Sequence, residues 1–187
     1  MTEHVVVSDL GSHIGEEITV KGWVYNTRSI GKIWFLILRD GTGLVQCVVV
    51  KAETSEDTFR LETALTQESS VIVTGTVREE PRSTGGFELG VKSIDVSQIA
   101  DEYPISPKEH GTDFLMNHRH LWIRSKLQHA ILRVRHQIIK ASRDFFDENG
   151  FTLIDSPIFT TNAAEGTTSE FEVGYFDRSA YLTQSGQ

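Results

Sequence analysis

Residues 22–50 read GWVYNTRSIGKIWFLILRDGTGLVQCVVV, and this stretch decides the fold of the first half of the chain. β-Branched and aromatic residues over 19–28 predict a first strand. Two apolar runs, 33–40 and 44–50, flank the short loop GTG, and such runs around a glycine-containing loop are typical of a β-hairpin. The stretch therefore predicts three consecutive strands.

The pattern stays rich in strands up to about residue 99. Residues 56–68 predict a short helix, 70–77 a fourth strand, 81–86 a turn and 87–99 a fifth strand in which apolar residues alternate. Three strands, a short helix and two strands follow the order of an OB-fold, an all-β barrel. Such barrels bind single-stranded nucleic acid on their second and third strands. The order by itself fits other small β-barrels as well.

A change of composition follows. Residues 101–120 contain two of the four prolines and a glycine, which predicts a linker. We therefore divide the chain into an OB-fold domain at 1–102, a linker at 103–123 and a second domain at 124–187.

The second domain is predicted to be α+β. Apolar residues four or three apart predict one face of a helix from Ser125 to Asn149, and Gly150 stands where a C-cap glycine belongs. FTLI (151–154) predicts a short strand that ends before Pro157, and a second strand is predicted within 175–184. The apolar face consists of Leu127, Ile131, Val134, Ile138, Ala141 and Phe145.

Composition limits the function classes. The formal net charge of −8 argues against a protein that coats nucleic acid indiscriminately, but it allows binding of one folded RNA through a local basic face. The single cysteine excludes an internal disulfide and a four-cysteine zinc site. The N-terminus lacks the features of a signal peptide, so a cytoplasmic protein is expected. We predict no metal site, because His110, His118 and His120 do not have ligand spacing.

Four side chains on the predicted strands have the chemistry to read unpaired bases. Phe35 offers a ring for stacking, and Gln46 has both a donor and an acceptor for a base edge. Arg28 suits a phosphate, and Glu88 suits the hydrogen-bond donors of a base. The plainer alternatives are a core position for Phe35 and a solvated one for Glu88. Further positive charge is expected from Lys21, Lys32 and Arg39.

The stretch 22–50 resembles the anticodon-binding OB domain of the class IIb aminoacyl-tRNA synthetases, which serve aspartate, asparagine and lysine. The resemblance implies that Phe35 stacks on the middle anticodon base and that Gln46 contacts its edge. It also implies that Glu88, in GFEL, approaches the third anticodon base and that Arg28 belongs to the same site.

Two later segments resemble the class II catalytic domain. FFDENGFTLIDSPIFT (145–160) resembles motif 1, a helix and strand ending at a proline, here Pro157, which implies a homodimer interface. The segment 163–187 resembles the start of the amino-acid pocket. It implies that Glu165 contacts the substrate's α-ammonium group, that Gln184 and Gln187 line the pocket, and that Ser185 lies near the adenylate.

Within this family, the SGQ at the end of the segment favours the asparaginyl branch, and an aspartyl enzyme, including one that charges both tRNAs, stays open. The resemblance implies an ATP- and Mg²⁺-dependent ligase that joins asparagine to tRNA. Nothing in the 187 residues matches the ATP-binding motifs 2 and 3. We therefore expect the N-terminal part of such a ligase, inactive by itself. A stand-alone OB-fold RNA-binding protein is the alternative.

Overall fold

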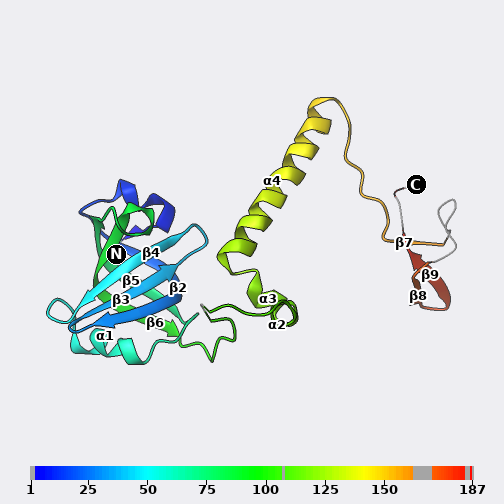
Figure 1. Ribbon diagram of the computed structural model, residues 1–187. Helices are drawn as coiled ribbons and strands as arrows, with labels where there is room; N and C mark the ends of the chain where they lie inside the picture. The colour runs from blue at the N-terminus through cyan, green and yellow to red at the C-terminus, as the bar shows by residue number, and fades with distance from the viewer. Residues whose placement is uncertain (1–2, 107, 162–169, 184–185, 187) are drawn as a thin grey trace. The chain divides into compact units, whose positions relative to one another are not determined.

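The computed structural model describes residues 3–106, 108–161, 170–183 and 186, and it separates two compact units (Figure 1). The first unit spans Met1–His110 and the second spans Gly111–Gln187. Each unit is described by itself below.

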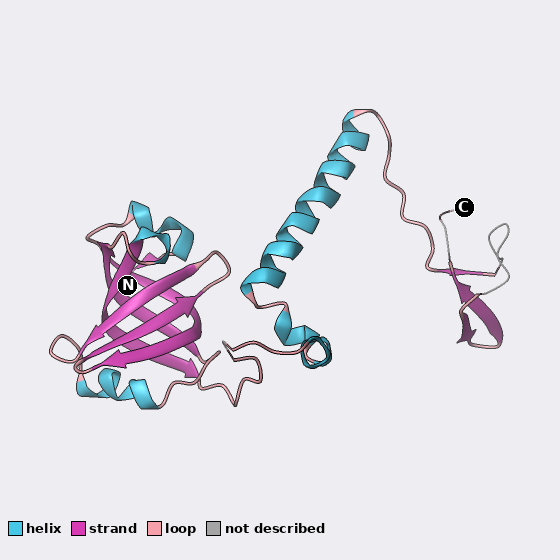
Figure 2. Cartoon of the chain, in the orientation of Figure 1, coloured by secondary structure: helices cyan, strands magenta, loops and turns pink. Residues whose placement is uncertain are grey.

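The first unit is built on a six-stranded sheet that closes on itself (Figure 2). The strands pair in the order β1-β2-β3-β4-β6-β5, and β5 also pairs with β2. This circuit of five long strands confirms the predicted OB-fold, and we call it the barrel. The strands are β1 (Glu3–His4), β2 (Glu17–Ile30), β3 (Ile33–Arg39), β4 (Leu44–Val50), β5 (Ser70–Glu79) and β6 (Phe87–Gln98).

Strand alternation decides which side chains fill the barrel. On β3, Trp34, Leu36 and Leu38 are fully buried, whereas Phe35 between them is half-buried. Successive side chains of a strand point to opposite faces, so the odd-numbered positions of β3 face outward. The outward-facing side chains of β3, including Phe35, are therefore available for contacts outside the core. The core also takes side chains from every other long strand, including Val20, Val49, Val73 and Leu89.

The hairpin turn between β3 and β4 is organised by Asp40. Its carboxylate accepts hydrogen bonds from the backbone N–H groups of Thr42 (2.7 Å) and Gly43 (2.9 Å), and from that of Val7 (2.8 Å). Burial alone would raise the pKa of Asp40, but the hydrogen bonds from Val7, Thr42 and Gly43 outweigh it and lower the pKa. The predicted turn is thus confirmed, and it also holds the N-terminal segment.

The predicted helix at 56–68 is shorter than expected. It comprises α1 (Glu56–Arg60) and one 3₁₀ turn, η2 (Leu61–Thr63). Glu68 has a φ of 69°, and its N–H donates to the carbonyl of Val24 at 2.7 Å. The chain therefore leaves the helical conformation in order to enter β5. Two further 3₁₀ turns are η1 (Val7–Ser12) and η3 (Thr84–Gly86).

The second unit is dominated by one long helix. Its elements are α2 (Thr112–Asn117), α3 (Arg119–Trp122), α4 (Lys126–Glu148), β7 (Phe159–Thr160), β8 (Glu172–Tyr175) and β9 (Arg178–Leu182). The long helix confirms the predicted one almost to the residue, and two short helices fall inside the predicted linker. The three strands pair in the order β7-β9-β8, and β9 confirms the predicted late strand.

Gly150 ends α4 as predicted. It has a φ of 83°, and the N–H of Phe151 donates back to the carbonyl of Phe146 at 3.0 Å. A left-handed residue followed by such a bond is a common helix C-terminal motif, which favours glycine.

The predicted strand at 151–154 is wrong. These residues are irregular, and Phe151, Leu153 and Ile154 are all exposed. A run of apolar residues becomes a strand only when a neighbouring strand accepts its hydrogen bonds. No such neighbour lies beside this segment in the part of the chain that the structure describes.

Candidate nucleic-acid interface

The four side chains predicted to read bases converge on one depression of the barrel. They come from four strands, Arg28 from β2, Phe35 from β3, Gln46 from β4 and Glu88 from β6. Strand register brings them together, because Arg28 lies opposite Phe35 and Gln46 lies opposite Glu88. The depression has a volume of about 460 Å³. Its other lining residues are Ile33, Val48, Glu80, Arg82 and Ser83.

Phe35 belongs to this surface and not to the core. It is half-buried, and the guanidinium carbon of Arg28 lies 4.5 Å from the centre of its ring. A cation at this distance over an aromatic face is attracted to the ring electrons. One face of Phe35 is therefore covered by a cation, and the alternative of a core phenylalanine is wrong.

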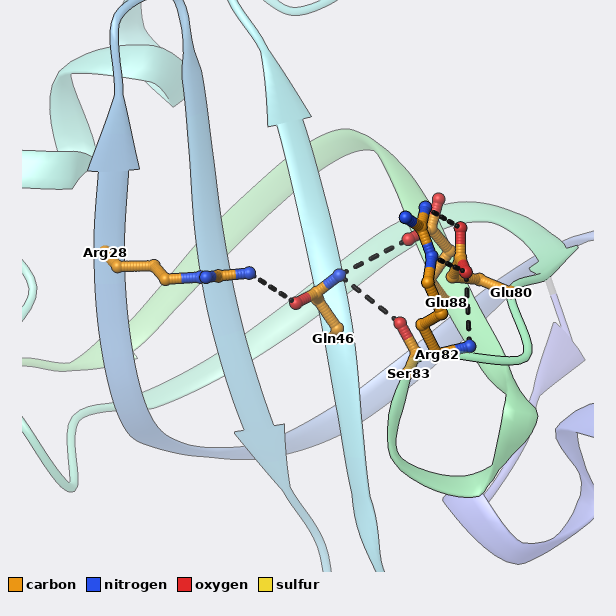
Figure 3. Close-up of polar contacts among 6 residues, drawn as sticks. All are labelled: Arg28, Gln46, Glu80, Arg82, Ser83 and Glu88. Atoms are coloured by element: carbon orange, nitrogen blue, oxygen red, sulfur yellow. Dashed lines mark hydrogen bonds and ion pairs between the residues drawn. The ribbon is translucent and has the colours of Figure 1, made fainter.

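Gln46 is the centre of the polar contacts (Figure 3). Its side-chain oxygen accepts from Nη2 of Arg28 at 3.3 Å. Its side-chain nitrogen donates to Oγ of Ser83 at 3.3 Å and to Oε2 of Glu88 at 3.4 Å. All three contacts are at the long end of the hydrogen-bond range, so an incoming polar group can replace them at small cost.

Three residues that line the depression, Glu80, Arg82 and Ser83, come from the segment between β5 and β6, for which the sequence predicted only a turn. Arg82 donates to Glu80 through Nε at 2.9 Å and through Nη2 at 3.1 Å (Figure 3). Hydrogen bonds from the Arg82 side chain and backbone lower the pKa of Glu80 to about 2. Glu80 directly precedes the predicted turn at 81–86, and Arg82 lies within it. Two opposite charges at this spacing were the only feature of the sequence that indicated this ion pair.

The charges of the depression are nearly balanced. Arg28 and Arg82 supply two cations, and Glu80 and Glu88 supply two carboxylates. Arg39, expected to add positive charge, forms an ion pair with Glu68 at 2.7 Å in which both side chains are largely buried. That expectation is wrong for Arg39, because its charge is already neutralised. Lys21 and Lys32 are exposed, but neither lines the depression.

The residues predicted for the amino-acid pocket, Glu165, Gln184, Ser185 and Gln187, lie outside the described residues. Pro157 is described and exposed, in the irregular segment after α4. The apolar face of α4 is exposed as well, and Leu127 and Phe145 are 68% and 61% exposed.

Comparison with known families agrees with this geometry. Residues 18–97 match the model of the OB-fold nucleic acid binding domain, and residues 111–187 match the class II tRNA synthetases for D, K and N. The two matched segments nearly coincide with the two compact units. The chain belongs to the class II tRNA synthetases. The barrel of this synthetase chain is its OB-fold nucleic acid binding domain.

Individual relatives narrow the likeness to one branch. The chain is 58% identical over 182 residues to the asparagine–tRNA ligase of Desulforamulus reducens and 56% identical over 185 residues to that of Pelotomaculum thermopropionicum. These matches include 97% and 99% of this chain but only 42% and 43% of the relatives. The chain therefore spans less than half the length of the curated relatives that it matches.

Solved structures of both the asparaginyl and the aspartyl branch are similar to this chain. The asparaginyl-tRNA synthetase of Pyrococcus horikoshii, in complex with asparaginyl-adenylate, matches all of this chain and 44% of its own, with a TM-score of 0.91 and 38% identity. A Leishmania major protein described as an aspartyl-tRNA synthetase matches 98% of this chain and 39% of its own, with a TM-score of 0.84 and 26% identity. No helix in the described part of the chain is long and apolar enough to cross a membrane.

Proposed function

We propose that this chain contributes the anticodon-binding barrel and part of the catalytic domain of an asparagine–tRNA ligase. The observation that carries the proposal is the convergence of Arg28, Phe35, Gln46 and Glu88 on one depression of a nucleic acid binding barrel. An aromatic ring beside polar side chains is the arrangement with which proteins bind unpaired RNA bases.

The depression suits a base inserted edge-on to the polar side chains. Phe35 provides the stacking surface, and base–aromatic stacking tolerates any base because every base has a π-face. Gln46 and Glu88 then supply the hydrogen-bonding groups that separate one base from another. Arg28 stands over the ring and is placed to meet a phosphate or a base oxygen.

Asparagine is the amino acid that the relatives favour. Identity is 55–58% to three asparagine–tRNA ligases, whereas identity to solved structures of the asparaginyl and aspartyl branches lies between 26% and 38%. Glu88 does not decide between the two, because a carboxylate accepts equally from a cytosine amine and from a uracil N–H.

The remaining parts of the proposal follow from the family. The ligase uses ATP and Mg²⁺ to activate asparagine, works in the cytoplasm, and forms a homodimer through the motif 1 segment that includes Pro157. The described residues contain no group of three or more His, Cys, Asp or Glu side chains that could hold a metal ion. The sequence contains no match to the ATP-binding motifs, so we expect no ATP–pyrophosphate exchange from these 187 residues alone.

The experiment that tests anticodon binding is Phe35→Ala. Loss of stacking should weaken binding of a fluorescent asparagine anticodon stem-loop by about 1–3 kcal/mol, measured by anisotropy titration at fixed salt. The fold should survive, because Phe35 faces outward and lies beside the buried Trp34 and Leu36, which stay in place.

A matched control is available on the same barrel. Phe59 of α1 is also half-buried beside a cation, with Nζ of Lys51 at 5.5 Å from its ring, but it packs against the core and does not line the depression. Phe59→Ala should leave the RNA affinity of the folded protein unchanged. Equal losses in the two variants, or no loss with Phe35→Ala in a folded protein, would refute the proposed site.

A further inference from the structure

We propose that residues 100–106, which follow the last barrel strand, form a strap that is fastened to the barrel by the connection between η2 and β5. The fastening residues are Thr66, Gln67 and Ser69. The barrel and the strap then move as one body, and bending of the chain between the two units begins only beyond Ser106. The inference does not depend on RNA binding, because none of these residues lines the depression.

The strap contains no helix or strand, yet much of it is covered. Residues 103–106 are all half-buried, whereas residues 101 and 102 are exposed. The compact unit that contains the barrel extends to His110, well past the end of β6 at Gln98. Domain boundaries normally fall in exposed linkers that make few contacts. The burial of 103–106 therefore indicates that the strap belongs to the barrel.

Two side-chain hydroxyls hold both backbone polar groups of Ala100. Oγ1 of Thr66 donates to the carbonyl of Ala100 at 2.7 Å, because a carbonyl can only accept. Since Thr66 has no second hydroxyl proton, it accepts from the hydroxyl of Ser69 at 2.9 Å. Oγ of Ser69 in turn accepts from the N–H of Ala100 at 3.1 Å. The direction of each bond is thus determined, and the start of the strap is held at two atoms.

Gln67 makes the second fastening. Its side-chain nitrogen donates to the carbonyl of Ile105 at 3.2 Å. The reversed amide would bring two acceptors together, so this orientation is the favourable one. Ile105 lies five residues after Ala100, and Pro104 between them has a restricted φ. The strap is therefore held near both of its ends.

The connection that carries the fastening residues is itself fixed to the sheet. The carbonyl of Ser69 accepts from the N–H of Val24 at 2.9 Å, and the N–H of Glu68 donates to the carbonyl of Val24 at 2.7 Å. Both carboxylate oxygens of Glu68 accept from Nη2 of Arg39, at 2.9 and 2.7 Å. Backbone bonds to β2 and an ion pair to β3 thus hold the connection, so the strap is fastened to the barrel and not to a loose loop.

Fastening limits how the barrel can move with respect to the rest of the chain. The reach and freedom of a linker grow with the number of residues that can bend. A linker that was free from the end of β6 would include all of residues 100–106. With these residues held on the barrel, only the chain beyond Ser106 contributes, which restricts the swivel of whatever the barrel carries.

The first test measures the mobility of the strap by NMR in the 187-residue protein. In the wild type, the ¹⁵N heteronuclear NOE values of Ala100, Tyr103 and Ile105 should equal those of β6. In the double variant Thr66→Ala/Gln67→Ala they should fall to the values of a free tail. Exchange of the Ala100 amide proton should become faster by about 2- to 10-fold, the effect of losing one hydrogen bond.

Two further variants control for the loss of a hydroxyl. Thr66→Ser keeps the hydroxyl and should leave the strap as rigid as in the wild type. Thr63→Ala removes a hydroxyl from the same part of the chain, but that hydroxyl donates to the carbonyl of Arg60 at 3.2 Å and not to the strap. This variant should also match the wild type.

A second test uses a protease that cuts after glutamate, with the products identified by mass spectrometry. Glu102 is exposed within the strap, but cleavage needs the flanking residues to open as well. Cutting after Glu102 should be slow in the wild type and faster in the double variant. The urea midpoint of the barrel should not change, because Thr66 and Gln67 lie outside its core.

Several outcomes would overturn the inference. They are tail-like NOE values for the wild-type strap, a double variant as rigid as the wild type, and a strap that is freed equally by Thr63→Ala. If the double variant also lowers the urea midpoint, the single variant Gln67→Ala decides. It should free Ile105 and leave Ala100 held, and equal loosening at both residues would contradict a strap with two fastenings.

Discussion

The two units of this chain differ in how they use their apolar residues. The barrel encloses its own, and side chains such as Val20, Trp34 and Val73 have no exposed surface. In the second unit, Ala180 is the one buried hydrophobic residue among those that the structure describes, and no residue of α4 is buried. The same kind of periodic apolar pattern therefore produced a core in one unit and an exposed stripe in the other.

The difference shows that periodicity specifies an element but not its partner. A strand needs neighbours for its hydrogen bonds, so a barrel that forms at all brings its apolar faces together. A helix satisfies its own backbone and can form with its apolar face uncovered. The geometry of the depression depends on strand pairing in the same way, because the register between paired strands fixes which side chains lie opposite one another.

The largest expected effect is the difference between removing a buried side chain of the barrel and removing an exposed side chain of α4. Leu36→Ala removes a fully buried side chain from the barrel and should lower the free energy of unfolding by about 2–5 kcal/mol. Phe145→Ala on the exposed stripe of α4 should change it by less than about 0.5 kcal/mol. Urea unfolding followed by tryptophan fluorescence measures both variants. Comparable losses would remove the distinction between the units.

A smaller effect should be confined to the second unit. Gly150→Ala places a side chain at a φ of 83°, which costs about 1–2 kcal/mol for an L-residue. The last turn of α4 should fray, and helical circular dichroism at 222 nm should fall. The urea midpoint of the barrel should not move. A shift of that midpoint would show that the two units are energetically coupled.

The smallest expected effect is a pH-dependent loss of barrel stability when the Asp40 carboxylate is removed. The pKa of Asp40 is lower in the folded state, so its carboxylate stabilises the fold above the unfolded pKa of about 4. That stability is lost as pH falls through the lower, folded pKa. Asp40→Asn should cost about 1 kcal/mol at pH 7, because the site is partly exposed to solvent and screened.

Urea titrations of the wild type and of Asp40→Asn at pH 7 and pH 3 test the direction in which their stability difference changes with pH. The difference between them should shrink at the lower pH, since protonation makes the wild-type side chain neutral too. A difference that grows on acidification would contradict the role assigned to the Asp40 carboxylate.

Much of the fold was predictable because its signals are local. The loop GTG between two apolar runs predicted the hairpin of β3 and β4, and the spacing of apolar residues predicted α4 nearly to its ends. The failures were long-range. The apolar segment 151–154 has the composition of a strand but pairs with no strand among the described residues, and the helix predicted over 56–68 ends at Thr63, before Glu68 bonds to the distant Val24.

Some residues of the candidate site could be proposed from the sequence, and others became apparent only in the structure. Phe35 and Gln46 were proposed because a ring and an amide on adjacent strands suit base binding, and chiefly because their stretch resembles an anticodon-binding domain. Ser83 and Arg82 were missed because they lie in a loop, 37 and 36 positions after Gln46 in the chain, where residue type alone gives no direction. Only the pairing of β4 with β6 brings that loop to the depression.

By itself, the sequence determined the succession of the five long barrel strands, the long helix, and which residue types were available to stack and to hydrogen-bond. These depend on neighbours within a few positions, where side-chain volume and backbone preference act. The tertiary structure decided which face of β3 Phe35 occupies, that Arg39 is neutralised by Glu68, and that Gln46 is held between a donor and two acceptors. Those outcomes depend on register between strands far apart in the chain, and the register is set only when the whole barrel closes.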